Sequence, residues 1–223
     1  MNTCIINYAK DGRENYEAGQ ERLRQSLVDV GYKGSLMLCN QVPVGCPEHS
    51  EVSHAFKAYL FKCAFECGFD LVLWLDASVV VQKPLGPVWD IIKGTGTLFN
   101  SNGDWRLNQW AGNTQLLAMG CPVVLAPQVL ICCSAVVGLS AYDVRCQSIV
   151  STMVNLVHVR GGVAYHGSTD ATSPDFKEVR HDQNVFSWMA YQYKLLYHTG
   201  VACYDYSSYV KDATFVLTDM GGL

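Results

Sequence analysis

Asp76 stands where an apolar segment ends, in the stretch FDLVLWLDAS at residues 69–78. Residues 71–75 are all apolar, as is typical of a strand covered by helices on both faces. In sheets of that kind, ligands bind outside the carboxyl ends of the strands. A carboxylate there suits Mg²⁺ or Mn²⁺, which take oxygen ligands. The alternative is that Asp76 caps the turn after the strand through its side chain.

A second acid, Asp182, lies in VRHDQNVF, just before an expected helix that begins at Gln183. At a helix N-terminus, backbone N–H groups and the helix dipole keep a carboxylate ionised and fixed in direction. Such a carboxylate can accept a proton or stabilise positive charge that develops in a reaction. The alternative is that Asp182 only caps the helix, and both roles are compatible.

The segments around Asp76 alternate between strand and helix. The expected order is a strand that opens residues 3–15, a helix within 16–32, a strand at 34–40, a helix within 50–68 and the strand that ends at Asp76. Ser50 or Ser53 is the expected cap of the second helix, and Gly68 its stop. Strands separated by helices predict an α/β fold with a mostly parallel sheet.

The second half of the chain is less regular. Strands are expected at 96–101 and 130–140, a short helix within 106–120, a helix over 141–157 and a capped helix with a β-rich end over 182–198. The Gly- and Ser-rich stretch 161–174 predicts a mobile surface loop, which we expect to order over a bound ligand.

Composition restricts the class of protein. The chain has 223 residues, of which 49% are hydrophobic and 16% charged, which predicts one soluble globular domain over residues 1–223. A net charge of −4 with scattered basic residues disfavours nucleic-acid binding. Without a signal-like N-terminus or a long apolar run, we expect no membrane span and a cytoplasmic location. The ten cysteines then indicate reduced thiols, and their spacing matches no usual zinc site.

The order of segments resembles that of nucleotide-sugar-dependent glycosyltransferases of the GT-A fold. The resemblance spans most of the chain and rests on an opening strand, a Y…RL…S helix, the HAFKAYLF helix, the DLVLWLDAS strand end, the CSAVVGLS strand and the HDQNVF helix. It implies a single GT-A-like, Rossmann-like α/β domain with helices flanking a mostly parallel central sheet. The family motif at the strand end is usually Asp-x-Asp, which holds a divalent cation on the donor diphosphate. Here it is Asp76-Ala77-Ser78, so Ser78 replaces the second carboxylate.

The resemblance also implies roles for single residues. Asp76 would hold Mn²⁺ or Mg²⁺ with the late His198, and Ser78 would lie at the donor beside it. Tyr8 and Asp11, at the end of the first strand, would bind the base and ribose, and Lys57 or Lys62 would approach the ribose or phosphate. Asp182 would lie near the acceptor hydroxyl and the anomeric carbon. The alternatives are a structural histidine and a solvated helix face for the lysines.

The expected activity is therefore transfer of a sugar from a nucleotide-diphosphate sugar to a hydroxyl-bearing acceptor. A sugar-phosphate nucleotidyltransferase is disfavoured because no Gly-rich phosphate loop with a basic residue follows the first strand. A non-catalytic nucleotide-sugar-binding or interaction protein, without the second motif carboxylate, stays open. Transfer onto modified nucleic-acid bases is a narrower alternative, against which the acidic net charge argues.

Overall fold

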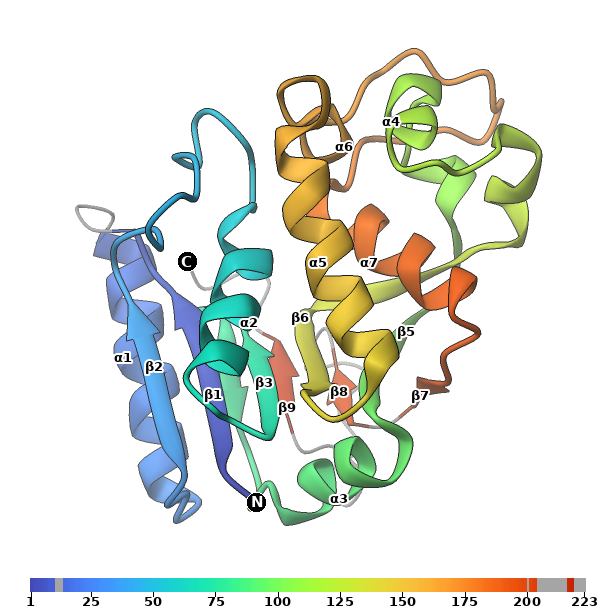
Figure 1. The fold of residues 1–223 in the computed structure, drawn as a ribbon. Helices are drawn as coiled ribbons and strands as arrows, with labels where there is room; N and C mark the ends of the chain where they lie inside the picture. Colours follow the sequence, from blue (N-terminus) through green and yellow to red (C-terminus); the bar gives the residue numbers. More distant parts are fainter. Residues whose placement is uncertain (11–13, 200, 204–215, 219–223) are drawn as a thin grey trace.

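A six-stranded sheet forms the centre of the molecule (Figure 1). The computed structural model describes residues 1–10, 14–199, 201–203 and 216–218. The strand order is β2 (Ser35–Cys39), β1 (Thr3–Tyr8), β3 (Leu71–Leu75), β6 (Leu130–Ser140), β5 (Thr97–Arg106) and β7 (Tyr197–His198). Pairs β1–β2, β1–β3 and β5–β7 are parallel, whereas β6 is antiparallel to both β3 and β5. The other strands of this sheet thus share one direction, which confirms the expected mostly parallel α/β fold.

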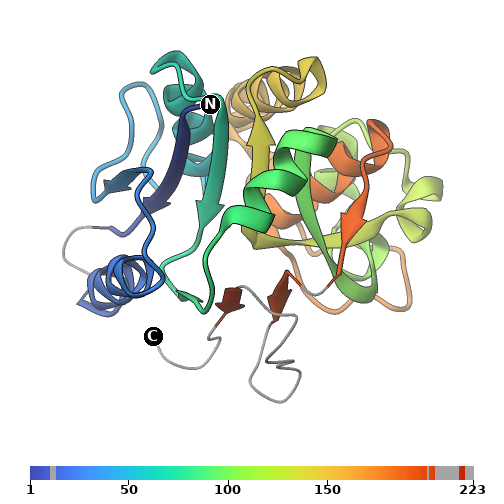
Figure 2. The ribbon, with the colours of Figure 1, turned by 90° about the horizontal axis from the view of Figure 1, so that it is seen from below.

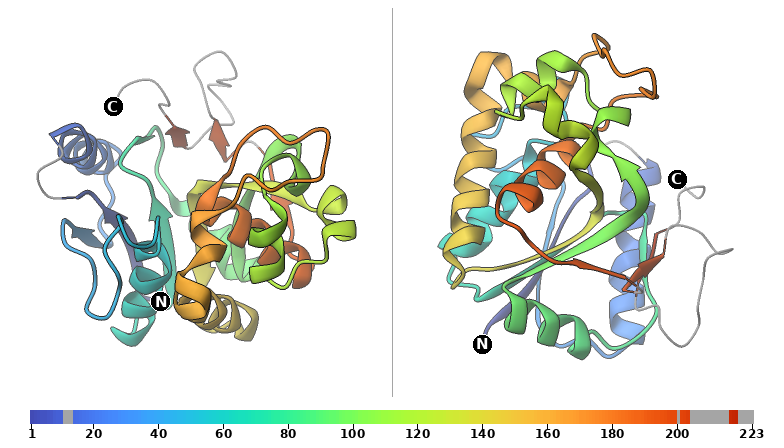
Figure 3. Two further views of the ribbon diagram at one scale, coloured as in Figure 1. Left: turned by 90° about the horizontal axis from the view of Figure 1, so that it is seen from above. Right: turned by 90° about the vertical axis from the view of Figure 1, so that its right-hand side faces the viewer.

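Helices cover both faces of this sheet (Figures 2 and 3). On one face α1 (Glu14–Asp29) and α3 (Gly86–Thr95) pack on Ile5, Leu73 and neighbouring side chains. On the other, α2 (Phe56–Glu66), α5 (Val144–His158) and α7 (His181–Gln192) pack on Ile6 and Trp74. Because successive strand residues point to opposite faces, one apolar run supplies both cores.

Shorter elements complete the described chain. A small sheet has the order β4 (Val79–Val81), β9 (Val216–Thr218) and β8 (Ala202–Cys203). The short helices are α4 (Asn113–Ala118), α6 (Val163–His166) and the 3₁₀ turns η1 (Leu107–Gln109), η2 (Val123–Gln128) and η3 (Val159–Gly161). Across the residues that the structure describes, no helix combines the length and the apolar character that a membrane crossing requires.

Two expectations about element boundaries were wrong. Helix α2 begins at Phe56, and neither Ser50 nor Ser53 caps it, because His54 has a φ of 59° that no helix can include. The stretch 161–174 is also not a continuous surface loop. It contains α6, whose Tyr165 is fully buried and donates a hydrogen bond from its hydroxyl to the Met153 carbonyl at 3.0 Å.

The close approach of α3 to the sheet gives a testable prediction. A Cβ on Gly138 of β6 would lie 2.4 Å from Ile92 Cδ1 and 2.9 Å from Leu98 Cβ. We expect Gly138→Ala to lower the free energy of unfolding by about 1–3 kcal/mol, the usual cost of overpacking. Gly86→Ala is the matched control, because its Cβ would meet no heavy atom within 4 Å. Equal urea midpoints for the two variants would contradict this view of the interface.

Candidate active site

Three charged side chains meet at the carboxyl end of β3. Lys57 lies in the first turn of α2, Asp76 directly follows β3, and Asp182 lies in the first turn of α7. The Lys57 Nζ is 3.0 Å from Asp76 Oδ1 and 2.9 Å from Asp182 Oδ2. It also donates a hydrogen bond to the Ser134 carbonyl of β6 at 2.9 Å. The fold thus joins the two acids through one ammonium group.

Burial makes this cluster electrostatically strong. Lys57 is 2% exposed and Asp182 4%, so water screens their interaction little. Burial lowers the pKa of Lys57, but the two carboxylates outweigh it and the pKa ends above the usual value. For Asp182 burial raises the pKa, and attraction to Lys57 is the largest of the effects that outweigh it, so the pKa ends below the usual value. The net shift of each pKa favours the ionised form of both groups.

Trp74 orients Asp76. Its indole Nε1 donates to Asp76 Oδ1 at 2.5 Å, and Lys57 Nζ lies 4.9 Å from the centroid of the same ring. The backbone closes the turn without the carboxylate, because the Val79 N–H donates to the Asp76 carbonyl at 3.0 Å. The side chain of Asp76, 32% exposed, is therefore directed at the cluster.

Asp182 does not cap α7. The helix begins at His181 with Arg180 as its N-cap residue, which places Asp182 inside the first turn. The following polar residues fix the helix, since Gln183 Nε2 donates to the Cys132 carbonyl at 2.6 Å and Asn184 Nδ2 to Gln115 Oε1 at 2.9 Å. The alternative that Asp182 caps a helix beginning at Gln183 was therefore wrong, and the carboxylate instead faces Lys57.

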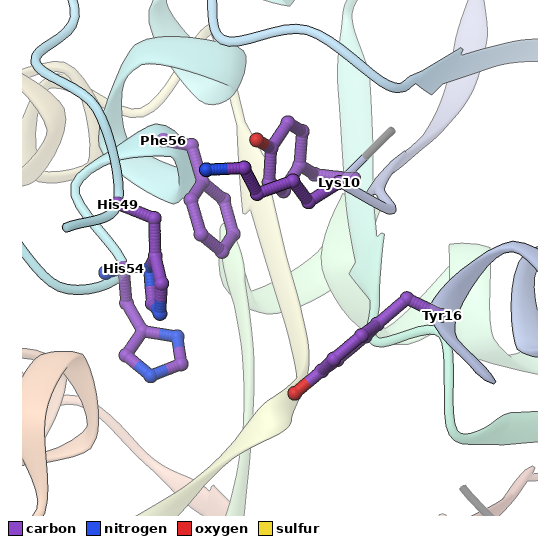
Figure 4. A pocket seen from close by; sticks show the side chains of 6 residues that line it. Lys10, Tyr16, His49, His54 and Phe56 are labelled. Atoms are coloured by element: carbon purple, nitrogen blue, oxygen red, sulfur yellow. Dashed lines mark hydrogen bonds between the residues drawn. The ribbon is translucent and has the colours of Figure 1, made fainter. Parts of the chain in front are cut away.

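A pocket opens at the carboxyl end of β1, next to the start of α2 (Figure 4). Its lining is aromatic and basic, and consists of Tyr8, Lys10, Tyr16, His49, His54 and Phe56. The rings of Tyr8 and Phe56 lie 4.3 Å apart between centroids. We call it the β1 pocket. Phe56 precedes Lys57, so the pocket adjoins the charge cluster.

A second cavity, of about 300 Å³, lies on the other side of Asp76. Asp76, Asn102, Trp105, Cys133, Ser134, Ala135, Arg180 and Gln183 line it, and we call it the β5 cavity. Trp105 stacks on Trp110 with 4.3 Å between centroids, and the Arg180 guanidinium carbon lies 4.9 Å from the Trp110 ring centroid. An aromatic surface with a cation on it thus borders the charge cluster.

The residues predicted from the sequence fall into three groups. Asp76, Lys57 and Asp182 form the cluster, and Tyr8 lines the β1 pocket. Lys57 is no solvated surface lysine, whereas Lys62 is half-exposed and pairs with Glu66 at 2.9 Å. Asp11 lies outside the described residues. Ser78 is half-buried in the turn between β3 and β4.

His198 lies elsewhere in the sheet. It pairs with Asn100 of β5 on strand β7, and strands β6 and β5 separate β7 from β3. Burial lowers its pKa. No described contact joins His198 to Asp76, so their shared role as metal ligands stays a prediction from the resemblance.

The described donor set does not by itself form a cation site. Asp76 is the only carboxylate that lines either cavity in the described chain, and its Oδ1 already bonds Trp74 and Lys57. The described residues also contain no group of three or more His, Cys, Asp or Glu side chains placed to hold a metal ion. A divalent cation would need most of its ligands from a bound diphosphate and water.

Sequence reasoning missed much of the lining. Lys10, Tyr16, His49 and His54 come from separate loops and from α1, and only tertiary structure brings them together. The segment HSEVSHAFK held a signal, since two histidines shortly precede the expected Lys57. The spacing of the two histidines in this segment follows neither helical nor strand periodicity, so the sequence alone did not show that His49 and His54 share a pocket.

Comparison with known proteins identifies the fold. No protein-family model matches the sequence, and a search of curated proteins finds no match. Solved structures match 99% of the chain. A glycosyltransferase involved in glycosylation of the major capsid of PBCV-1 has a TM-score of 0.56, 15% identity and 94% of its chain covered. Mouse xyloside xylosyltransferase 1 matches with a TM-score of 0.51 and 11% sequence identity, and 97% of its chain is covered. WbbM, a bifunctional glycosyltransferase, matches with a TM-score of 0.57 and 11% sequence identity, and 46% of its chain is covered.

These structures share the fold of this chain. Their low sequence identities establish that fold and nothing finer. The GT-A glycosyltransferase fold inferred from the order of segments is therefore confirmed.

The charge cluster predicts the effect of removing its cation. Lys57→Met leaves two carboxylates, one of them deeply buried, without their shared partner, and we expect a loss of about 3–5 kcal/mol in unfolding free energy near neutral pH. Lys62→Met on the same helix removes only an exposed pair with Glu66, so we expect little change in the unfolding free energy. Similar losses in both variants, measured by urea unfolding, would show that the cluster does not stabilise the fold.

The same variant predicts a pH dependence. In the wild type, the lowered pKa of Asp182 stabilises the folded state at every pH above the usual pKa of an aspartate. This stabilisation is lost as the pH falls through the pKa of Asp182 in the folded state. In Lys57→Met, burial without the cation raises that pKa, so the folded state takes up a proton more readily. The stability gap between variant and wild type should therefore narrow between about pH 7 and pH 5. A constant gap would contradict an ionised Asp182.

Proposed function

We propose that this chain is a glycosyltransferase that moves a sugar from a nucleoside-diphosphate sugar to a hydroxyl group of an acceptor. One observation carries the proposal. Asp76 and Asp182, singled out separately in the sequence, share Lys57 at the border between the β1 pocket and the β5 cavity. A donor whose nucleotide contacts the β1 pocket would place its sugar at this border.

The β1 pocket, a recess of about 50 Å³, does not enclose a nucleotide, but its lining suits contact with part of the nucleotide half of such a donor. Tyr16 presents an exposed aromatic ring on which a base can stack, whereas the buried rings of Tyr8 and Phe56 pack on each other in the pocket wall. Lys10 and His49 offer N–H groups to phosphate oxygens at the same pocket. Its position outside the carboxyl end of β1 is the usual ligand face of an α/β sheet.

The β5 cavity suits the transferred sugar. Sugar rings combine apolar C–H faces with hydroxyl groups, and this cavity combines the Trp105 ring with the polar ends of Asn102, Arg180 and Gln183. Its volume of about 300 Å³ is at the small end of ligand sites. We therefore assign to it the transferred sugar, not an entire glycan.

A divalent cation, Mn²⁺ or Mg²⁺, stays part of the proposal only as a companion of the diphosphate. Such ions neutralise the charge that develops on a diphosphate leaving group. Because the described protein offers one carboxylate here, we expect the cation to bind with the donor and not before it.

A nucleotide-sugar-binding protein without turnover is the second candidate. The burial of Asp182 favours it, because a carboxylate 4% exposed does not reach a ligand directly. It differs from the enzyme in one measurable respect, which is release of nucleoside diphosphate from a bound donor.

The first test is a ligand screen. UDP-, GDP-, ADP- and dTDP-sugars, each with Mn²⁺ or with a chelator, should include one that raises the melting temperature, because binding to the native state stabilises it. The same donor should then be converted to free nucleoside diphosphate. Binding without conversion supports the second candidate, and a screen with no stabilising donor refutes the assignment.

Asp182 gives the sharper test. Asp182→Asn keeps the shape of the side chain but removes the negative charge beside Lys57, so we expect turnover to fall about 100-fold or more while donor affinity stays near normal. Asp90→Asn, on the exposed face of α3, is the control and should keep full turnover. Near-normal turnover of Asp182→Asn would exclude a role for this carboxylate in the reaction.

A further inference from the structure

His54 has an unusual backbone conformation directly before α2. Its φ of 59° lies in the left-handed region, which residues other than glycine seldom adopt. Its N–H donates to His49 Nδ1 at 3.1 Å, and the two rings meet edge to face at 4.8 Å. Residues held in such conformations gather at functional sites, where the surrounding structure maintains them. His54 is therefore held in one orientation.

That orientation places the His54 ring between Asp182 and the β1 pocket. His54 Nδ1 is 3.9 Å from Asp182 Oδ1, while Asp182 Oδ2 faces Lys57 at 2.9 Å. The side chain of His54 is 35% exposed and lines the pocket, into which Figure 4 shows it pointing. Asp182 is 4% exposed and pairs with Lys57 through Oδ2, so His54 is the member of the pair that a ligand can touch.

The surroundings keep His54 neutral. Burial lowers its pKa to about 4, with Asp182 and Asp76 opposing that shift and Lys57 and His49 adding to it. The ring of His181 on α7 also lies near, 5.4 Å away between centroids. Because Nδ1 faces a carboxylate, electrostatics favour the tautomer with hydrogen on Nδ1, which leaves a lone pair on Nε2. A neutral imidazole can accept a proton through Nε2, although a pKa of about 4 makes it a weak base until Asp182 stabilises the positive charge.

We infer that His54, and not Asp182, receives the proton of the acceptor hydroxyl, with Asp182 as its positioning residue. This inference rests on the proposed function. The acceptor oxygen forms a bond to the anomeric carbon, the bond from that carbon to the diphosphate oxygen breaks with its electron pair on the diphosphate, and the acceptor proton moves to His54 Nε2. The resulting imidazolium pairs with Asp182 through Nδ1–H. A contact of 3.9 Å in the ligand-free protein shortens as this charge forms.

His54→Gly with added imidazole tests the inference. Glycine adopts a φ of 59° without strain and leaves room for the lost ring. We expect turnover to fall by at least about 100-fold, the range for loss of a general base, and to rise again by at least about tenfold when imidazole is added. The recovered rate should rise with pH as imidazole loses its proton. His166→Gly, at an exposed position on α6, should keep wild-type turnover and show no effect of imidazole.

A second variant and a binding measurement separate the possible failures. His54→Asn tolerates the left-handed backbone but offers no basic nitrogen, so it should be as slow as His54→Gly and gain nothing from imidazole. Calorimetric titration of both variants with UDP, GDP and ADP should give dissociation constants within about threefold of the wild-type values. If the wild type is active and the His54 variants are also active, with no effect of imidazole, this inference alone is overturned. If the wild type turns over no donor, the proposed function and this inference are both overturned.

Discussion

The candidate site depends on one buried ammonium group shared by two carboxylates. Lys57 has almost no contact with water, and its charge is acceptable only because Asp76 and Asp182 lie about 3 Å away. The dependence is mutual, since Asp182 is equally removed from water and keeps its charge through Lys57. Any arrangement of α2, β3 and α7 that separates these groups would leave a buried charge unpaired, so the cluster fixes the three elements relative to one another.

The direction of β6 makes this meeting possible. Because β6 runs opposite to β3, its early residues lie beside the end of β3, and the Asp76 N–H donates to the Ala135 carbonyl at 2.9 Å. The same part of β6 accepts Gln183 from α7 and Lys57 from α2 through the carbonyls of Cys132 and Ser134. One reversed strand thus supplies backbone acceptors to both helices that bring charge to the site.

The cluster also separates two unlike surroundings. The β1 pocket presents aromatic rings and imidazoles, whereas the β5 cavity presents an indole, a guanidinium and amide groups. A nucleotide sugar is itself divided in this way, with a flat base and charged phosphates at one end and a hydroxylated ring at the other. Under the proposed function, the two halves of the donor match the two sides of the cluster in chemical character.

The sequence by itself determined most of the larger elements and their order, because apolar periodicity and glycine positions are local properties of the chain. It did not predict helix α3 or the small sheet of β4, β9 and β8. It also marked Asp76 and Asp182, since each follows a local boundary signal. It did not reveal that one lysine joins them, that α2 begins only after His54, or that His54 and His49 share a pocket with Tyr8. Those facts depend on distances between residues far apart in the chain, and on burial, which sets the charge of a group and whether it reaches a ligand. Only the tertiary structure decides both.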